Sequence, residues 1–113
     1  MTRKVTLYLE DILDCINKIE EYTSGVSFAE FDKNQLLIDA VIRNLEVIGE
    51  AAKYIPQDIR EQYSLIPWKN IIGLRNILIH EYFGIDERIV WEVVTVDLMN
   101  TKPLLEQLIR ELQ

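Results

Sequence analysis

The residues best suited to chemistry lie close together in the second half of the chain. Residues 68–83 are mostly apolar, yet they hold five polar side chains within eight residues: Arg75, Asn76, His80, Glu81 and Tyr82. His80 is the only histidine of the 113 residues. A buried polar group is costly unless it is paired, so this cluster predicts a shared site. A lone histidine in a helical protein can also be a capping or core residue, and that interpretation stays open.

Helix geometry constrains how these side chains can meet. Arg75 and Tyr82 are seven residues apart and share one face, whereas Asn76 and His80 are four apart and share another. Arg75 and His80 lie about 140° apart around the axis, at roughly 100° per residue. They can meet in three ways. The guanidinium reaches around the helix, His80 lies in a distorted last turn before Gly84, or the two groups meet across a symmetric dimer.

The segment RNILIHEY, which is Arg75-x4-His80-x-Tyr82, resembles the motif of the HEPN superfamily. Within that superfamily the chain is most similar to the HepT-like toxins of bacterial and archaeal toxin–antitoxin pairs. Residues 43–51, RNLEVIGEA, resemble the second-helix signature of the family. The flanks of the motif are similar as well, at Trp68, Ile71, Gly73, Leu74, Ile85, Asp86, Val90 and Trp91. The resemblance covers essentially the whole chain.

This resemblance implies a metal-independent endoribonuclease, in the form of a homodimer whose two motifs line one cleft. Cleavage of RNA through its own 2′-hydroxyl requires one proton to leave that oxygen and another to reach the leaving group. An imidazole can serve in either role, so His80 is the expected general acid/base. A guanidinium can bind a phosphate bidentately, so Arg75 is the expected phosphate ligand. Asn76 is expected to orient the substrate or His80.

The resemblance also implies a protein partner. In these pairs a minimal nucleotidyltransferase acts as antitoxin, and in some members it transfers AMP to the motif tyrosine, here Tyr82. The added phosphates would lie beside Arg75 and block the cleft. A structural tyrosine that packs the end of the bundle is the alternative. The RNA substrate is expected to be a tRNA or an mRNA, and neither a cofactor nor a metal is expected.

A second class of function is a non-catalytic HEPN module that binds nucleotide or RNA, or that contacts the transferase. Other residues are weaker candidates for chemistry. Glu46 and Glu50 are four residues apart, a spacing that can hold a metal, but the remaining ligands of a di-metal site are missing from the sequence. Cys15 is expected in the core, and Trp68 and Trp91 in the core or at a dimer interface.

Composition limits the class of protein. The 113 residues are 49% hydrophobic and carry a net charge of −7, which indicates one folded, cytoplasmic domain over residues 1–113 without a leader or membrane-spanning segment. This acidity counts against general coating of nucleic acid. Residues 53–75 are the exception, because they hold Lys53, Arg60, Lys69 and Arg75 against two acids. Two such windows at a dimer axis would form a basic cleft; ordinary surface scatter is the alternative.

The elements that position these residues are helices. Apolar residues recur at intervals of three and four, which predicts an all-α, up-and-down bundle of four or five helices. A first helix should end near Ser24-Gly25, and a second should run from the Ser27/Glu30 capping box to Pro56. A short helical turn should fill residues 56–67. A third helix should run from Trp68 to Gly84, and a fourth should follow Asp86. Pro103 should kink that helix or divide it from residues 104–112.

Overall fold

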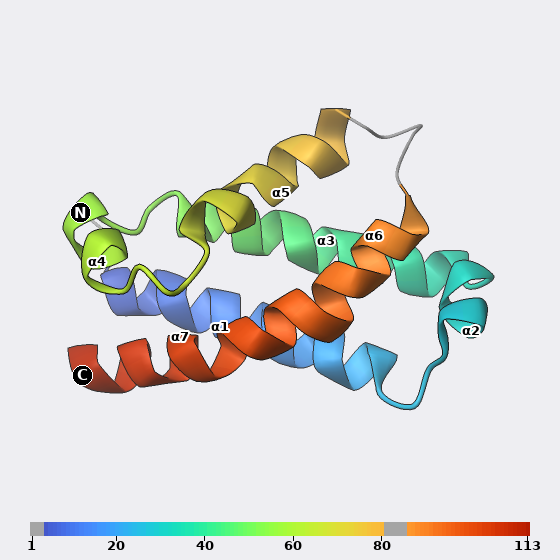
Figure 1. The fold of residues 1–113 in the computed structure, drawn as a ribbon, viewed down its shortest axis with the longest axis horizontal. Coiled ribbons are helices and arrows are strands. Elements are labelled where there is room, and N and C mark those ends of the chain that lie inside the picture. Colours follow the sequence, from blue (N-terminus) through green and yellow to red (C-terminus); the bar gives the residue numbers. More distant parts are fainter. Residues whose placement is uncertain (1–3, 81–85) are drawn as a thin grey trace.

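The chain folds into a bundle of helices, and the computed structural model describes residues 4–80 and 86–113, with the backbone alone at residues 75–80. Two short helices, α2 (Phe28–Asp32) and α4 (Gln57–Gln62), lie in the connections. The long segments alternate in direction (Figure 1), and they are α1 (Val5–Thr23), α3 (Gln35–Ala52), α5 (Trp68–His80) and the continuous run of α6 (Glu87–Glu92), the π-helix η1 (Val93–Asp97) and α7 (Leu98–Leu112). The described ranges contain no strand, and the predicted all-α up-and-down bundle is confirmed.

The first helix follows its apolar pattern. Its seam of Leu9, Ile12, Ile16 and Ile19 is almost completely buried. The helix stops at Thr23, and Gly25 adopts a φ of +72°, a backbone conformation that glycine adopts without strain. The end predicted near Ser24-Gly25 is therefore confirmed.

The predicted second helix is in fact two helices. Ser27 and Glu30 form the expected capping box, but the helix that they begin, α2, ends after five residues at Asp32. Asn34 then caps a new helix, because its side-chain oxygen accepts a hydrogen bond from the backbone N–H of Leu37 at 3.1 Å. A side chain that competes for backbone N–H groups favours a helix start over a helix interior, which is why the continuous helix was wrong.

The last helical segment is not divided at Pro103. Pro103 lies inside α7, so of the two predicted effects, a kink or a division from residues 104–112, the division is wrong. The irregular turn lies upstream instead, in the π-helix η1, where the backbone N–H of Leu98 donates to the carbonyl oxygen of Val93. Asp86 caps α6 as expected, because its side chain accepts a hydrogen bond from the N–H of Arg88 at 2.9 Å.

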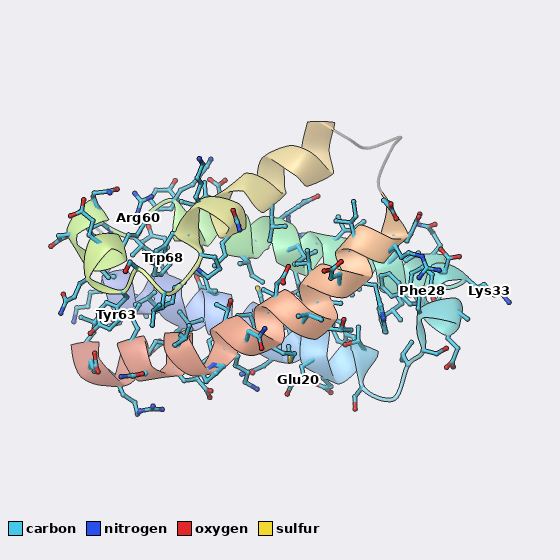
Figure 2. The ribbon with its side chains drawn as sticks, viewed as in Figure 1. Glu20, Phe28, Lys33, Arg60, Tyr63 and Trp68 are labelled. Atoms are coloured by element: carbon cyan, nitrogen blue, oxygen red, sulfur yellow. The ribbon has the colours of Figure 1, made fainter. Side chains whose placement is uncertain are left out.

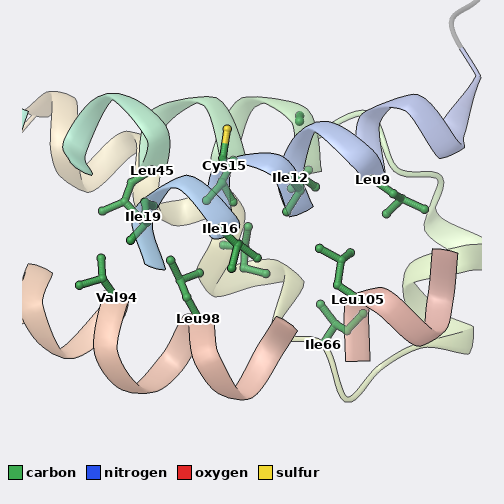
Figure 3. Close-up of a cluster of buried hydrophobic side chains, with 14 of the residues drawn as sticks. Leu9, Ile12, Cys15, Ile16, Ile19, Leu45, Ile66, Val94, Leu98 and Leu105 are labelled. Carbon is green, nitrogen blue, oxygen red and sulfur yellow. The ribbon is translucent and has the colours of Figure 1, made fainter. Parts of the chain in front are cut away.

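The core lies between α1, α3 and α7. Figure 3 shows aliphatic side chains of α1 meeting those of α3 and of η1–α7, with Leu45, Val94, Leu98 and Leu105 among the partners. Helix α1 packs against both α3 and α7, whereas α5 packs extensively against α3 alone among the described residues. Among the described residues, a groove separates α5 from α6, η1 and α7. No helix in residues 4–80 or 86–113 is both long enough and apolar enough to cross a membrane.

Candidate active site on helix α5

Helix α5 is held at its first residue by buried side chains. Trp68 is 6% exposed, and its indole nitrogen Nε1 donates to the carbonyl oxygen of Tyr63 at 3.1 Å. Ile66 and Ile71 are also buried on either side of Trp68. Trp68 is thus a core anchor, one of the two roles predicted for it. The start of α5 is fixed to the bundle by this packing, and the helix carries the motif residues away from that point (Figure 1).

Three of the four predicted site residues belong to α5. The backbone is helical through Arg75, Asn76 and His80, and their side chains lie outside the described residues. The described part of α5 ends at His80, before the predicted distorted turn. Arg75 and His80 lie about 140° apart on the helix, and the three ways in which they can meet stay predictions. Tyr82 and the predicted helix end at Gly84 lie outside the described residues.

The helix positions of α5 fall into two strips that matter for the site. Positions 69, 73, 76 and 80 lie within a strip of about 60°. Lys69 is exposed at one end of this strip. A Cβ atom added at Gly73 would meet no heavy atom within 4 Å, so the strip is open at its centre as well. The positions of Asn76 and His80 continue this strip, whereas Arg75 shares a second strip with Trp68 and Ile72.

We call the large groove between α5 and the α6–η1–α7 run the α5–α7 groove. Its volume is about 830 Å³. Two of its lining residues are aspartates, Asp86 and Asp97, and most of the others are apolar. Exposed apolar side chains also line it, with Leu65 82% and Ile89 58% exposed. It is lined by Leu45, Leu65, Pro67, Lys69, Asn70, Ile71, Gly73, Leu74, Asp86, Ile89, Val90, Val93, Asp97, Leu98, Asn100, Thr101 and Leu104.

A second groove, which we call the α4–α5 groove, lies at the beginning of α5. Its volume is about 630 Å³. It brings together two members of the basic window, Arg60 and Lys69, which the sequence places nine residues apart. It is lined by Gln57, Arg60, Glu61, Ser64, Ile66, Pro67, Trp68, Lys69, Asn70 and Ile72. Sequence reasoning included the two cations in the window but missed the groove, which residues of α4, of the following connection and of α5 line together.

Glu46 and Glu50, the two weaker candidates for metal ligands, each form an ion pair with a basic residue three positions away. The carboxylate of Glu46 lies 3.8 Å from the guanidinium of Arg43, and that of Glu50 lies 3.2 Å from the ammonium of Lys53. Lys53 therefore contributes less free positive charge to the basic window than was expected. The part of the chain that the structure describes contains no group of three His, Cys, Asp or Glu side chains that could hold a metal ion.

Two further predictions concern core residues. Cys15 is buried as expected, and burial raises the pKa of its thiol, which makes it a poor nucleophile. Trp91 is half-buried, and its ring lies 4.9 Å from that of Phe31 and 6.3 Å from that of Phe28. Sequence reasoning missed this aromatic cluster, although the i, i+3 spacing of the two phenylalanines was its signal. The cluster attaches α6 to α2.

Comparison with known proteins gives a consistent result. A family model described as "Ribonuclease HepT-like" matches residues 12–112. The protein named "Putative RNase MJ1380" of Methanocaldococcus jannaschii is 46% identical over 104 residues, which is 92% of this chain and 95% of that protein. "Probable ribonuclease HepT" of Thermococcus cleftensis is 43% identical over 108 residues, which is 96% of this chain and 98% of that protein.

A third relative extends well beyond the region that matches this chain. "Gamma-glutamylcyclotransferase and putative RNase MJ0434" of Methanocaldococcus jannaschii is 44% identical over 112 residues. These residues are 99% of this chain but only 50% of that protein. No solved structure matches the chain.

Proposed function

Because the chain belongs to the HepT-like ribonuclease family, we propose that it is an endoribonuclease toxin that cleaves RNA in the cytoplasm with Arg75 and His80. The observation that carries this proposal is the complete Arg-x4-His-x-Tyr motif in a chain that is 46% identical to a protein named as an RNase. The continuous helix α5 supports it, since one rigid element holds Arg75, Asn76 and His80 at fixed relative positions.

The chemistry follows from the side-chain types. One imidazole of His80 removes the proton of the 2′-hydroxyl, and that oxygen attacks the adjacent phosphorus. The 5′-oxygen leaves and takes a proton, so the products are a 2′,3′-cyclic phosphate and a 5′-hydroxyl. Arg75 stabilises the added negative charge of the pentacoordinate phosphate, and Asn76 orients the substrate or His80. This route needs no metal.

A homodimer would supply both an acid and a base, one His80 from each copy. The α5–α7 groove supports this part of the proposal, because it is largely apolar and is lined by the exposed side chains of Leu65 and Ile89. Exposed apolar surface next to a site is typical of a surface that another protein covers. Arg75 of one copy could then reach His80 of the other in spite of their separation on one helix.

The proposed restraint is a minimal nucleotidyltransferase antitoxin that transfers AMP from ATP to the phenol oxygen of Tyr82. The phenol loses its proton, the bond between the α- and β-phosphates of ATP breaks, and pyrophosphate leaves. The resemblance of the motif to that of HepT-like toxins supports it, and the added phosphate would compete with RNA for Arg75. Co-expression with the transferase and mass spectrometry of the chain test this step. A mass increase by one or more AMP units on a peptide that contains Tyr82 is expected, and Tyr82→Phe should abolish it. An unmodified Tyr82 would rule out this mechanism.

The catalytic proposal is tested by cleavage of a labelled RNA in the presence of a metal chelator. His80→Ala should lower the rate by about 10²- to 10⁴-fold, the usual contribution of a general acid/base. Arg75→Ala should lower it by a similar factor, since it removes a ligand of the transition-state charge. An RNA with a 2′-deoxy sugar at the cut position should resist cleavage. Lys33→Ala serves as the control, because Lys33 is exposed at the end of α2 and lies outside α5 (Figure 2).

The same assay separates the two classes of function. If the parent chain and His80→Ala cleave RNA equally fast, the catalytic proposal is wrong. If neither cleaves but both bind RNA or the transferase, the chain is a non-catalytic HEPN module. The net charge of −7 is the observation that favours this second function.

A further inference from the structure

We propose that the α4–α5 groove is a second RNA-contact site, which binds backbone phosphate of the same strand about five nucleotides from the cut position. This inference rests on the proposed function, because it concerns how the RNA substrate lies on the protein. The two cations among the described lining residues of the groove, Arg60 and Lys69, come from different elements, α4 and α5.

Arg60 is held in position for such a contact. Its Nε donates a hydrogen bond to the carbonyl oxygen of Ile55 at 2.9 Å, which fixes the plane of the guanidinium at the wall of the groove. A guanidinium carries five N–H donors, so this bond leaves its two terminal nitrogens for another oxygen. Within residues 4–80 and 86–113, no ion pair includes Arg60. A positioned cation without a carboxylate partner is suited to an external anion.

Lys69 provides the second charge. It is exposed and lines the same groove, and the described part of the chain offers it no ion-pair partner either. Trp68 also lines the groove, and it is attached to the core because it is buried and donates through its indole nitrogen. One carboxylate, that of Glu61, is among the described lining residues, and its Oε1 accepts a hydrogen bond from Gln57 Nε2 at 3.2 Å. The described lining residues thus carry two positive charges and one negative charge, in a chain whose overall charge is −7.

The position of the groove relative to the motif gives the path of the strand. Lys69 and His80 are eleven residues apart on the same strip of α5, which is about 16 Å at 1.5 Å per residue. A stacked strand carries one phosphate per roughly 3.4 Å of its axis, so about five nucleotides span this distance. Lys69 and Gly73 of this strip also line the α5–α7 groove, so the strand follows the edge of that groove to reach Lys69. Arg60 adds the second cation at the α4 end of the strip, so the strand should leave the motif toward α4.

Binding is measured first, on an RNA that cannot be cut. The probe is a fluorescein-labelled 2′-O-methyl RNA of about 12 nucleotides, which is longer than the span requires. Loss of two phosphate contacts should reduce the slope of log K against log salt by about 1.4, at roughly 0.7 per contact for a single strand. The affinity ratio of parent to Arg60→Ala/Lys69→Ala should thus fall by about sevenfold between 50 and 200 mM salt.

The control variant is Lys18→Ala/Lys33→Ala, which removes the same charge from two exposed lysines of α1 and the end of α2. Figure 2 shows Lys33 at the opposite end of the molecule from Arg60. If the control and the groove variant change the salt slope equally, the effect is one of net charge and the inference is wrong. If the groove variant alters binding of a protein partner but leaves the salt slope for RNA unchanged, the inference is also wrong.

Cleavage of short and long substrates then tests the distance. The groove variant should cleave an RNA of about three nucleotides as the parent does, and should show a raised KM with unchanged kcat on an RNA of about 12 nucleotides. An equal change on both substrates would overturn the inference. If the parent binds RNA with the predicted salt dependence but cleaves nothing, the catalytic proposal fails while the second contact site stands.

Discussion

At the scale of single residues, Gly25 and Gly73 show that the room for a side chain and the backbone conformation are two different constraints on a position. A Cβ atom would meet nothing within 4 Å at either position. Gly25 has a φ of +72°, whereas Gly73 lies inside α5 without a positive φ. The two sites therefore have the same room for a methyl group and opposite backbone preferences.

Gly73→Ala should raise the free energy of unfolding by about 0.5–1 kcal/mol, because alanine has the higher helix propensity and no clash opposes it. Chemical denaturation with an unchanged m-value measures this effect. Gly25→Ala is the matched control and should lower the stability by about 1–2 kcal/mol, because its conformation is left-handed. Equal effects of the two substitutions would contradict the argument.

At this scale, sequence reasoning predicted correctly that positions 75, 76 and 80 lie on one helix, but it could not predict which residues of different elements meet. The motif pattern places Arg75, Asn76 and His80, since spacing along a helix is a local property. The meeting of Arg60 and Lys69 could not be read from the sequence, because it depends on how α4 packs beside α5. Whether the motif side chains meet within one chain or between two copies stays a prediction.

At the scale of elements, the break between α2 and α3 depends on the side chain of one residue, Asn34, which caps α3. Apolar residues continue with helical spacing through this region, so periodicity predicted one helix. The capping preference of Asn34 was the competing local signal, and Phe31 shows the packing that accompanies it, with 0% exposure and its ring against Trp91. The starts of α5 and α6 were predicted correctly because Pro67 and Asp86 mark them.

Asn34→Ala should destabilise the fold by about 1 kcal/mol, since it removes the hydrogen bond to the N–H of Leu37. Asn34→Asp keeps an acceptor and adds a negative charge at a helix start, so it should retain most of the stability. Urea unfolding of the three chains compares them. A stability of the aspartate variant as low as that of the alanine variant would show that the cap is not the reason for the break.

At the scale of the whole molecule, two side-chain contacts connect distant parts of the bundle to α7. The ammonium of Lys102 lies 3.2 Å from a carboxylate oxygen of Glu20 on α1. The hydroxyl of Tyr63, at the end of α4, donates to the carboxylate of Glu111 near the end of α7. This second bond lowers the pKa of Glu111 and raises the pKa of Tyr63.

The pH dependence of the Tyr63–Glu111 bond has two limits. Glu111 ionises more easily in the folded chain, so its contribution is present above its ordinary pKa of 4.5 and is lost as pH falls through the lowered value. Tyr63 has a raised pKa, so its contribution is present below 10.0 and is lost as pH rises through the folded value. The bond should thus stabilise the fold between these limits.

Tyr63→Phe should lower the midpoint of thermal unfolding slightly near pH 7, and the difference from the parent should vanish in acid below the pKa of Glu111. Thermal unfolding at a series of pH values measures this. Tyr22→Phe is the control, because Tyr22 is 40% exposed on α1, away from this bond. A difference that persists unchanged into acid would indicate lost packing rather than a lost hydrogen bond.

The burial of Cys15 has a practical consequence. The chain has a single thiol, and that thiol lies on the inner face of α1 among side chains of the core. An aromatic disulfide reagent can reach the sulfur only when α1 separates from its neighbours. In the regime where closing outpaces the reagent, the labelling rate reports the equilibrium population of opened molecules. Cys15 is thus a natural probe for the opening of α1. Its labelling rate can be compared with and without RNA, and no engineered cysteine is needed.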